Sequence, residues 1–425
     1  MNRKKDALKP DARNRWLNLG LVALLTYLLV FTGMQIYLEG WCAACDYCAF
    51  LSAGQVINDG QIVDIYDLDT LESYQREVFT AANSMSPEFE VLGILYLPVF
   101  ILPFSLFALL EFKTGLILWM GINIIGLILY LRFFIKKLFG HQPRFRLILI
   151  LMLSLPVYQT IFYGQVNLLL VIAVGEFYRA LKSDKFFLAG LWLGGLLIKP
   201  QLLILILPFL LIQRRFKALG GFAVAALGVG GASFALVGLE GLIRMKDAVL
   251  AAAAGGVSSN PMFMMNWRML GIYLSSFTWP VLGEVFTIGL SLITALLTLF
   301  VFRKRMTTDD PRFTTALLAV MAATTLIAPH AHTHTAVILL PVLVASFLRK
   351  ELPQKLFYFW AFFPMVVNFC LYLLGAAIKV DLLPTSLALL ILVLYGTAML
   401  ISNLILLVWS LRWKREELVS PEDNS

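Results

Sequence analysis

Long apolar runs, separated by short polar segments, fill most of the chain. A helix needs about 20 apolar residues to cross a bilayer, and the runs show no alternation with the period of two that a membrane strand requires. The pattern therefore predicts an all-α polytopic membrane protein. Twelve runs are the predicted spans: 16–38, 114–134, 145–162, 164–181, 186–198, 201–213, 216–238, 279–302, 313–328, 334–348, 356–375 and 384–411.

The composition supports this class of protein. Of the 425 residues, 60% are hydrophobic and only 14% are charged, whereas a soluble chain is about 25% charged. Soluble enzymes, nucleic-acid binders and secreted disulfide scaffolds are thereby excluded. The net charge of +8 indicates no nucleic-acid partner, because the basic residues stand at the ends of the predicted helices. Membrane lipids are the partners that this arrangement predicts.

The charges also predict an orientation, because Lys and Arg resist translocation. The tail 1–15 carries six basic residues and no cleavable signal pattern, which places it in the cytoplasm. Residues 39–90 hold ten acidic residues and one basic residue, so this segment lies outside. Both termini are cytoplasmic if 91–112 does not cross. Pro98 and Pro103 favour a broken, re-entrant or interfacial segment there, since each proline removes a helix hydrogen bond.

Seven regions follow along the chain. They are a basic tail (1–15), a first span (16–38), an outer segment (39–112), core spans (113–238), a second outer loop (239–278), C-terminal spans (279–411) and a cytoplasmic tail (412–425).

Three hairpins are short, and each has a polar tip. Residues 186–213 must turn at Lys199-Pro200-Gln201, and they are too few for two full spans, which need about 40 residues. The hairpins 145–181 and 313–348 turn at 163–167 and at 329–334. A bare ammonium at membrane depth costs about 2.5 to 3.5 kcal/mol. The three tips therefore predict a water-filled cavity that opens outward.

The outer segment contains apolar residues at helical spacing after Asp46. This spacing predicts an interfacial amphipathic helix with Asp46 in its first turn, where the helix dipole favours an anion. Cys42, Cys45 and Cys48 stand nearby. Their spacing fits one disulfide with a thiol left over, or half of a metal site, and the sequence leaves both open.

Several short motifs follow one another along the chain. They are Asp46-Tyr47 with Ala49, Ala53 and Gly54, then Ile65-Tyr66-Asp67, Tyr96-Leu97-Pro98, Gly164 to Leu169, Lys199-Pro200-Gln201 and Ala328-Pro329-His330. With these motifs in this order, the chain resembles the bacterial membrane glycosyltransferases of family 87, part of the GT-C class. In this family a proline usually stands where this chain has Leu97. The resemblance covers 46–330 and hardly reaches the last two helices.

The resemblance implies a GT-C-like bundle of about 12 helices with an extracytoplasmic amphipathic-helix loop after the first helix. It also implies an inverting transfer of a hexose, with mannose as the first suggestion. The donor is a polyprenyl phosphate sugar, the acceptor is a lipid or glycan, and the site faces the outside of a bacterial plasma membrane. The phosphate is already a good leaving group, so a base and an anion clamp suffice, and no cofactor or metal is expected.

Asp46 is the candidate base, against the alternative of a solvated loop carboxylate or helix cap. Lys199 is the candidate clamp for the carrier phosphate, against a lysine that snorkels to the surface. Arg268 is a second candidate for the same anion, against the alternative of a surface arginine. Gln165 and Asn167 are candidate contacts to the sugar or carrier, with capping or interhelical amides as the alternative.

His330, His332 and His334 form the last candidate group. His330 and His332 are expected to hydrogen bond with phosphate or sugar, and His334 is either part of the site or the start of the next helix. Alternate residues of an extended tip also suit a metal ion.

Two other functions remain open from the sequence. A transporter or flippase has inverted repeats and polar residues near the bilayer midplane, whereas here the polar positions gather on one side. A polysaccharide ligase or polymerase, with a diphosphate carrier, favours more outer arginines than Arg76, Arg244 and Arg268.

Overall fold

The computed structural model describes residues 12–38, 45–81, 91–253, 264–379, 384 and 388–416. Cys42 and most of the two predicted cytoplasmic tails lie outside the described residues, as does the side chain of Cys45. Cys48 is buried and carries a free thiol.

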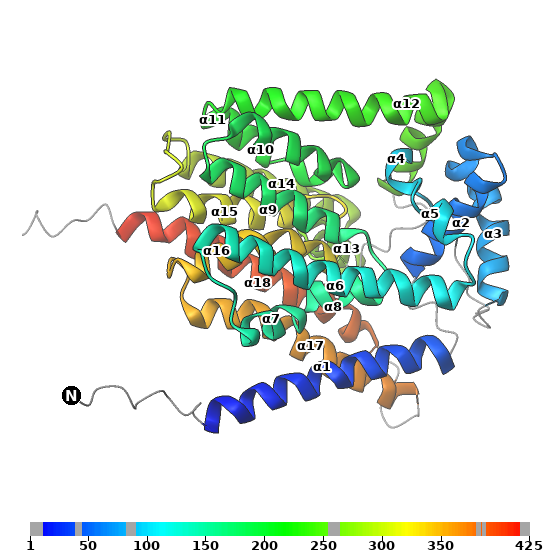
Figure 1. Ribbon diagram of the computed structural model, residues 1–425, viewed down its shortest axis with the longest axis horizontal. Coiled ribbons are helices and arrows are strands. Elements are labelled where there is room, and N and C mark those ends of the chain that lie inside the picture. Colours follow the sequence, from blue (N-terminus) through cyan, green and yellow to red (C-terminus); the bar gives the residue numbers. More distant parts are fainter. Residues whose placement is uncertain are drawn as a thin grey trace, which may run out of the picture.

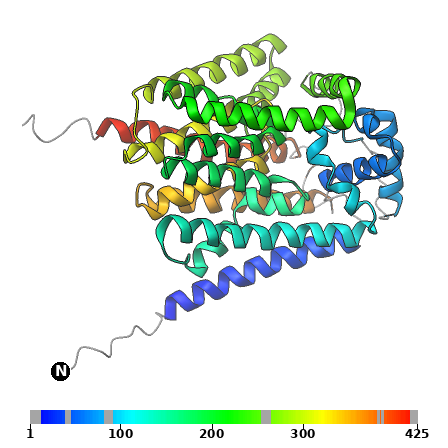
Figure 2. The ribbon, with the colours of Figure 1, turned by 45° about the horizontal axis from the view of Figure 1, so that its top comes forward.

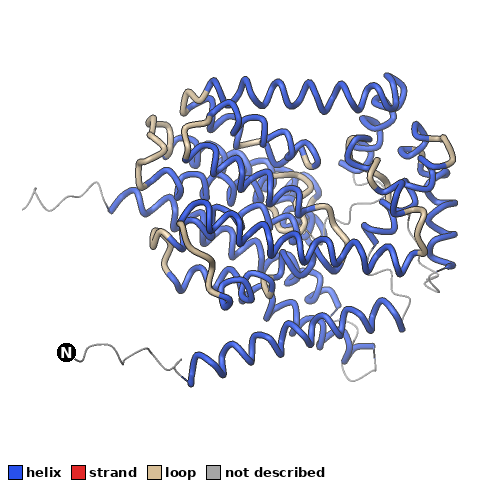
Figure 3. The backbone as a smooth tube through the Cα atoms, viewed as in Figure 1, coloured by secondary structure: helices blue, strands red, loops and turns tan. Residues whose placement is uncertain are grey.

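The described chain is helical, and Figure 3 shows helices joined by loops. The α-helices are α1 (Ala12–Leu38), α2 (Cys45–Asn58), α3 (Leu68–Ala81), α4 (Pro98–Ile101), α5 (Phe104–Phe107), α6 (Phe112–Phe139), α7 (Phe145–Met152), α8 (Leu155–Phe162), α9 (Asn167–Lys182), α10 (Phe186–Leu193), α11 (Ile206–Ile212), α12 (Phe216–Ala253), α13 (Trp267–Phe277), α14 (Pro280–Val301), α15 (Arg312–Ile327), α16 (Leu340–Leu348), α17 (Gln354–Lys379) and α18 (Ala388–Glu416). Four short 3-10 helices are η2 (Ile62–Tyr66), η3 (Gly194–Ile198), η4 (Pro200–Leu203) and η6 (Thr333–Leu339).

The long helices form a bundle, with a small group of shorter helices at one end. Figure 1 shows α2 and α3 at that end beside α4 and α5, and α1 along one side of the bundle. In Figure 2, α1 again lies at the edge of the bundle. Both views show α1 beginning and α18 ending at the opposite end from α2.

Five helices are long and apolar enough to cross a membrane, namely α6, the long part of α12, α14, α17 and α18. The pair α7 and α8 is a sixth if its bend of 64° is counted within one span. The chain is thus an all-helical membrane protein. Six further apolar segments are shorter, among them both halves of two predicted hairpins, so the total of twelve spans stays a prediction.

All three predicted hairpin tips are breaks in helical structure. Lys199 lies between η3 and η4, the residues 163–166 lie between α8 and α9, and 328–332 separate α15 from η6. Helical hydrogen bonding stops at the first two of these positions because Pro200 lacks an N–H and Gly164 takes a left-handed conformation with φ of 62°. The prediction of short hairpins with polar tips is confirmed at all three places.

Two predictions for the outer segment have different outcomes. A helix does begin at Cys45, with Asp46 in its first turn. The placement of this helix on a membrane surface is wrong, because its residues from Tyr47 to Gly54 are all buried. Its apolar side chains are covered by α3, α4 and α5 instead of lipid. Before α6 begins at Phe112, residues 91–111 hold only the one-turn helices α4 and α5, which begin at or next to Pro98 and Pro103 and confirm a broken segment.

The two segments predicted to lie outside contact each other. Helix α12 changes direction at Gly238, whose φ of 64° and ψ of −167° lie outside the helical range. The part of α12 beyond Gly238 packs against η2 and α4. There Arg244 Nη1 lies 2.6 Å from Asp64 Oδ1 of η2. The predicted second outer loop, 239–278, is therefore largely helical where it is described, with α13 as its second helix.

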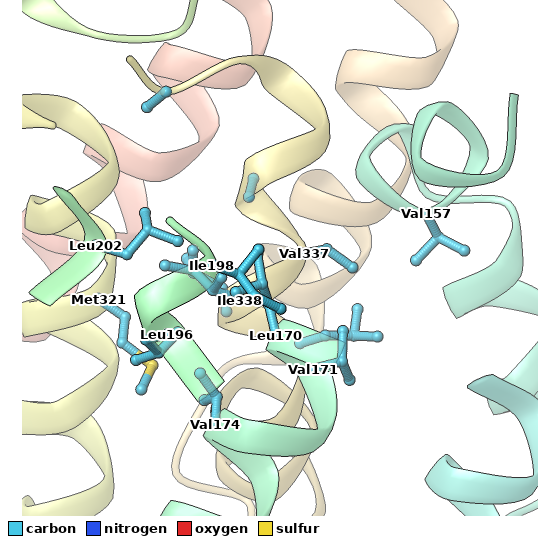
Figure 4. Close-up of a cluster of buried hydrophobic side chains, with 14 of the residues drawn as sticks. Val157, Leu170, Val171, Val174, Leu196, Ile198, Leu202, Met321, Val337 and Ile338 are labelled. Atoms are coloured by element: carbon cyan, nitrogen blue, oxygen red, sulfur yellow. The ribbon is translucent and has the colours of Figure 1, made fainter. Parts of the chain in front are cut away.

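Figure 4 shows a cluster of buried apolar side chains, several of which lie close to the three tips in the sequence. Leu170 follows the first tip, Ile198 and Leu202 flank Lys199, and Val337 and Ile338 follow the histidines. Close packing of such side chains fixes the backbone on both sides of each tip. The polar tips are thus held by rigid neighbours.

Candidate functional site

The three tips and the start of α2 bring a carboxylate, an amide, an ammonium and an imidazole together. Lys199 Nζ lies 3.2 Å from Gln165 Oε1 and 3.3 Å from His334 Nε2. The Gln165 side chain also hydrogen bonds with Asp46, and the charges of Asp46 and Lys199 act on each other. Four residues that are distant in sequence therefore form one polar cluster.

The Lys199 ammonium is held by two acceptors. Its side chain is buried, and an ammonium can only donate, so both Gln165 Oε1 and His334 Nε2 accept from it. His334 is consequently neutral, with its proton on Nδ1. One N–H of the ammonium remains for another partner, and a nearby anion is the partner that best offsets burying the charge.

The Gln165 amide has a defined orientation. Its oxygen accepts from Lys199 and, at the longer distance of 3.5 Å, from the Tyr96 hydroxyl. Its NH₂ group is therefore free to donate to the Asp46 carboxylate, and this hydrogen bond lowers the pKa of Asp46. Gln165 thus connects the ammonium to the carboxylate.

Asp46 is partly exposed at the first turn of α2. Burial raises the pKa of the Asp46 carboxyl above its ordinary value, while the hydrogen bond from Gln165 and the charge of Lys199 oppose this shift. The net direction is upward. A carboxylate with a raised pKa is a better proton acceptor than an ordinary aspartate.

The turn before Gln165 contacts the start of α2 and holds it in position. The Tyr47 backbone N–H donates to the Tyr163 carbonyl at 3.2 Å, and Trp119 Nε1 donates to the Gly164 carbonyl at 2.8 Å. A Cβ added to Gly164 would lie 2.5 Å from Tyr47 Cβ. Glycine is required here both for its positive φ and for this close approach.

The histidine turn is held by residues 265–268, which belong to the predicted second outer loop. Met265 N–H donates to Ala331 O at 2.9 Å, and the Asn266 amide donates to Ala328 O at 2.7 Å. Arg268 Nη1 donates to Pro329 O at 3.3 Å, which places its guanidinium beside this turn. The charge of Arg268 also acts on His330.

The three imidazoles lie against one another. The ring centroids of His330 and His332 are 4.8 Å apart, and those of His332 and His334 are 5.5 Å apart. His330 and His332 are partly exposed, whereas His334 is buried. Among the described residues, no group of three or more His, Cys, Asp or Glu side chains is arranged to hold a metal ion.

Asn167 differs from the other predicted site residues. It is fully buried, and its Nδ2 donates to Thr160 Oγ1 at 3.1 Å and to the His334 carbonyl at 3.2 Å. These contacts match the interhelical alternative. Asn167 stabilises the backbone of the histidine turn through the His334 carbonyl and does not contact the Asp46 cluster.

Sequence reasoning missed a second polar network beside His334. Gln159 Nε2 donates to the Tyr395 hydroxyl at 2.6 Å, and the hydroxyls of Tyr163 and Tyr395 lie 3.0 Å apart. Thr333 also hydrogen bonds with Gln159. Tyr395 comes from α18, where a single tyrosine in an apolar helix gave no signal.

The fold and this cluster define a polytopic membrane protein with an enzyme-like polar site at its hairpin tips. The model of glycosyltransferase family 87 matches residues 95–329, and the chain belongs to this family. The matched range includes Gln165, Lys199 and Arg268, and ends at Pro329. No curated protein matches the chain, and no solved structure does.

Proposed function

We propose that this glycosyltransferase is an inverting enzyme of the GT-C type that uses a polyprenyl phosphate sugar. The sugar is a hexose, with mannose as the first suggestion, and the acceptor is a lipid or glycan. The observation that carries the proposal is the connection of Asp46 to Lys199 through Gln165. It supplies a proton acceptor and an anion partner within one site, which are the two groups that this reaction needs.

The roles follow from that geometry. Asp46 takes the proton of the acceptor hydroxyl while the acceptor oxygen forms a bond to the anomeric carbon. The bond from this carbon to the phosphate oxygen breaks on the opposite face, which inverts the centre. The polyprenyl phosphate leaves with the electron pair, and Lys199 stabilises the developing negative charge.

Further residues complete the proposed donor site. Arg268 lies beside the histidine turn and adds a second positive charge for the phosphate. His330 and His332 are partly exposed and supply hydrogen bonds to the phosphate or sugar. Gln165 orients the base, and Asn167 holds the turn.

The location is part of the proposal. The acidic segment that contains Asp46 faces the outside of a bacterial plasma membrane, and the basic segments between helices face the cytoplasm. The start of α1 and the end of α18 lie at the same end of the bundle. This arrangement supports an even number of spans with both termini in the cytoplasm.

A transfer assay tests the function. The purified chain in lipid nanodiscs is incubated with a polyprenyl phosphate hexose and a bacterial lipid extract, and the released polyprenyl phosphate is quantified. Release that depends on the extract and on Asp46 supports the proposal. A wild-type chain that releases none with mannose, glucose or galactose donors overturns it, and a change in donor orientation without cleavage favours the flippase instead. Lipid profiles of cells lacking the chain then identify the acceptor.

A further inference from the structure

Two turns meet at the end of the bundle opposite α2. One turn lies between α11 and α12, and the other lies between α14 and α15. Figure 1 shows α11 and the start of α12 at this end. The buried side chain of Gln213 joins the two turns. Its Nε2 donates to Phe302 O at 2.6 Å and to Lys304 O at 3.0 Å, and its Oε1 accepts from the Met306 N–H at 2.8 Å.

This contact brings basic residues from both turns together. They form what we call the basic cluster, namely Arg214, Arg215, Arg303, Lys304 and Arg305. Arg215 Nη2 donates to the Met306 carbonyl at 2.7 Å, and its guanidinium carbon lies 4.6 Å from the centre of the Phe186 ring. Burial and the repulsion from Arg305 lower the pKa of Arg215, while the charge of Asp184 opposes this shift. The cluster thus holds like charges close to one another.

The basic cluster differs from its surroundings in how its charges are paired. Within the described ranges, no carboxylate lies close enough to form an ion pair with any of its five residues. Neighbouring turns do pair their arginines, namely Arg179 with Glu176, Arg312 with Asp310 and Arg349 with Glu351. The tendency of basic residues to stay on one side of a membrane does not require them to meet. Repulsion between like charges costs free energy, which a bound anion offsets.

The cluster also borders an exposed apolar surface. Helices α12 and α14 are long and apolar enough to cross a membrane, and α11 packs against both. The cluster directly precedes α12 and follows α14, so it lies at the level of the lipid headgroups in a bilayer that these helices cross. Leu211, Phe216 and Phe300 come from the adjoining helix ends, and each is more than half exposed. A cationic surface next to an apolar one suits a molecule with an anionic head and hydrocarbon chains.

We propose that the basic cluster binds the headgroup of an anionic phospholipid that carries two phosphates, as cardiolipin does. Guanidinium groups bind phosphate through two parallel hydrogen bonds, and each of the two turns contributes arginines for one phosphate. Basic sites between membrane helices are typical places for such headgroups. The acyl chains lie along Leu211, Phe216 and Phe300. This inference does not depend on the proposed function, because the cluster lies at the opposite end of the bundle from α2 and Asp46.

Lipid titration followed by native mass spectrometry tests the inference. The purified chain in detergent is titrated with cardiolipin, phosphatidylglycerol or phosphatidylcholine. The test variant combines Lys304→Gln with Arg305→Gln, and the matched control combines Lys136→Gln with Lys137→Gln at the end of α6. All four side chains are exposed, and both variants remove two charges. We expect the wild-type chain to bind cardiolipin most tightly, the test variant to lose about 30-fold in this affinity, and the control to change less than about twofold.

Two results would show that the cluster is not a lipid site of this kind. Cardiolipin that binds the wild-type chain no more tightly than the other two lipids overturns the inference. An equal loss in the test and control variants also overturns it, because general attraction between basic residues and anionic lipid then explains the binding.

Two further measurements separate the lipid from a soluble anion and guard against misfolding. Inorganic diphosphate that displaces cardiolipin at an equal concentration shows a site for soluble phosphate and overturns the inference, whereas cardiolipin that stays bound supports it. Melting temperatures check that both variants fold. A cardiolipin with a diazirine in an acyl chain is expected to label α11, the start of α12 or the end of α14 in the wild-type chain. Labelling elsewhere overturns the inference whether or not the variants fold.

Discussion

Lys199 Nζ lies 3.3 Å from Nε2 of His334, and both side chains are buried. The pair joins two hairpins that are 135 residues apart in the chain. A lysine held in this way has lost much of its side-chain freedom before any ligand arrives, which lowers the entropic cost of binding an anion.

Removing the proposed base should abolish transfer. Asp46→Asn keeps the size of the side chain but removes its ability to accept a proton, so we expect kcat to fall about 10² to 10⁴-fold. Released polyprenyl phosphate is the readout, with size-exclusion profiles and melting temperature as controls for folding. Activity within a few-fold of wild type would show that another group takes the proton.

The pH dependence of transfer should report on Asp46. A base works only when deprotonated, and burial raises the pKa of Asp46, so activity should fall with decreasing pH sooner than for an ordinary aspartate. Gln165→Leu removes a hydrogen bond that lowers this pKa, so the acidic limb of kcat/KM should move to higher pH. A limb that stays in place in Gln165→Leu contradicts the proposed role of the amide.

Truncating the proposed clamp should weaken donor binding. A hydrogen bond to a charged group is worth about 1.5 to 3 kcal/mol, so Lys199→Ala should weaken binding of polyprenyl phosphate about 10 to 100-fold. Lys217→Ala is the matched control, because Lys217 is exposed and lies outside the site. Similar affinities for wild type and Lys199→Ala in nanodiscs would argue that the phosphate binds elsewhere.

Gly164→Ala should separate backbone strain from a steric clash. Left-handed φ costs a non-glycine residue about 1 to 2 kcal/mol, and in addition the new Cβ meets Tyr47. Gly140→Ala is the control, because Gly140 has φ of 74° but no atom within 4 Å of its added Cβ. We expect both variants to melt at lower temperature and only Gly164→Ala to lose transfer. Equal activity in the two variants would show that the Tyr47 contact does not position Asp46.

The positions of the hairpin tips could be predicted because they follow from the lengths of the apolar segments and the thickness of the membrane. A membrane of fixed thickness and basic residues at both ends of 186–213 leave only Lys199 and its neighbours for the turn. The position of Asp46 in the structure was harder to predict from the sequence. Its helix has the apolar spacing of a surface helix, and only the covering α3, α4 and α5 show that this helix is buried inside the protein.

The partners of the site residues were beyond sequence reasoning. Tyr163 and Tyr395 are 232 residues apart, and their contact depends on the relative rotation of α8 and α18. Asn167 has the same amide as Gln165 two residues earlier, yet only Gln165 reaches the charged cluster. Gln165 lies on the turn and Asn167 is the first residue of α9, so their side chains point in different directions, and composition carries no information about this.

The short hairpin at Lys199 also bears on the lipid around the protein. Each of its apolar segments, 186–198 and 200–212, spans about 20 Å at 1.5 Å per residue, against a hydrocarbon core of about 30 Å. Phe187, Ile204 and Leu211 on this hairpin are exposed, so the mismatch falls on the adjoining bilayer, which becomes thinner there. In the proposed orientation, local thinning brings the outer headgroup layer closer to the depth of the ammonium. For the proposed donor, bilayer thickness thereby becomes a determinant of how easily its phosphate reaches the site.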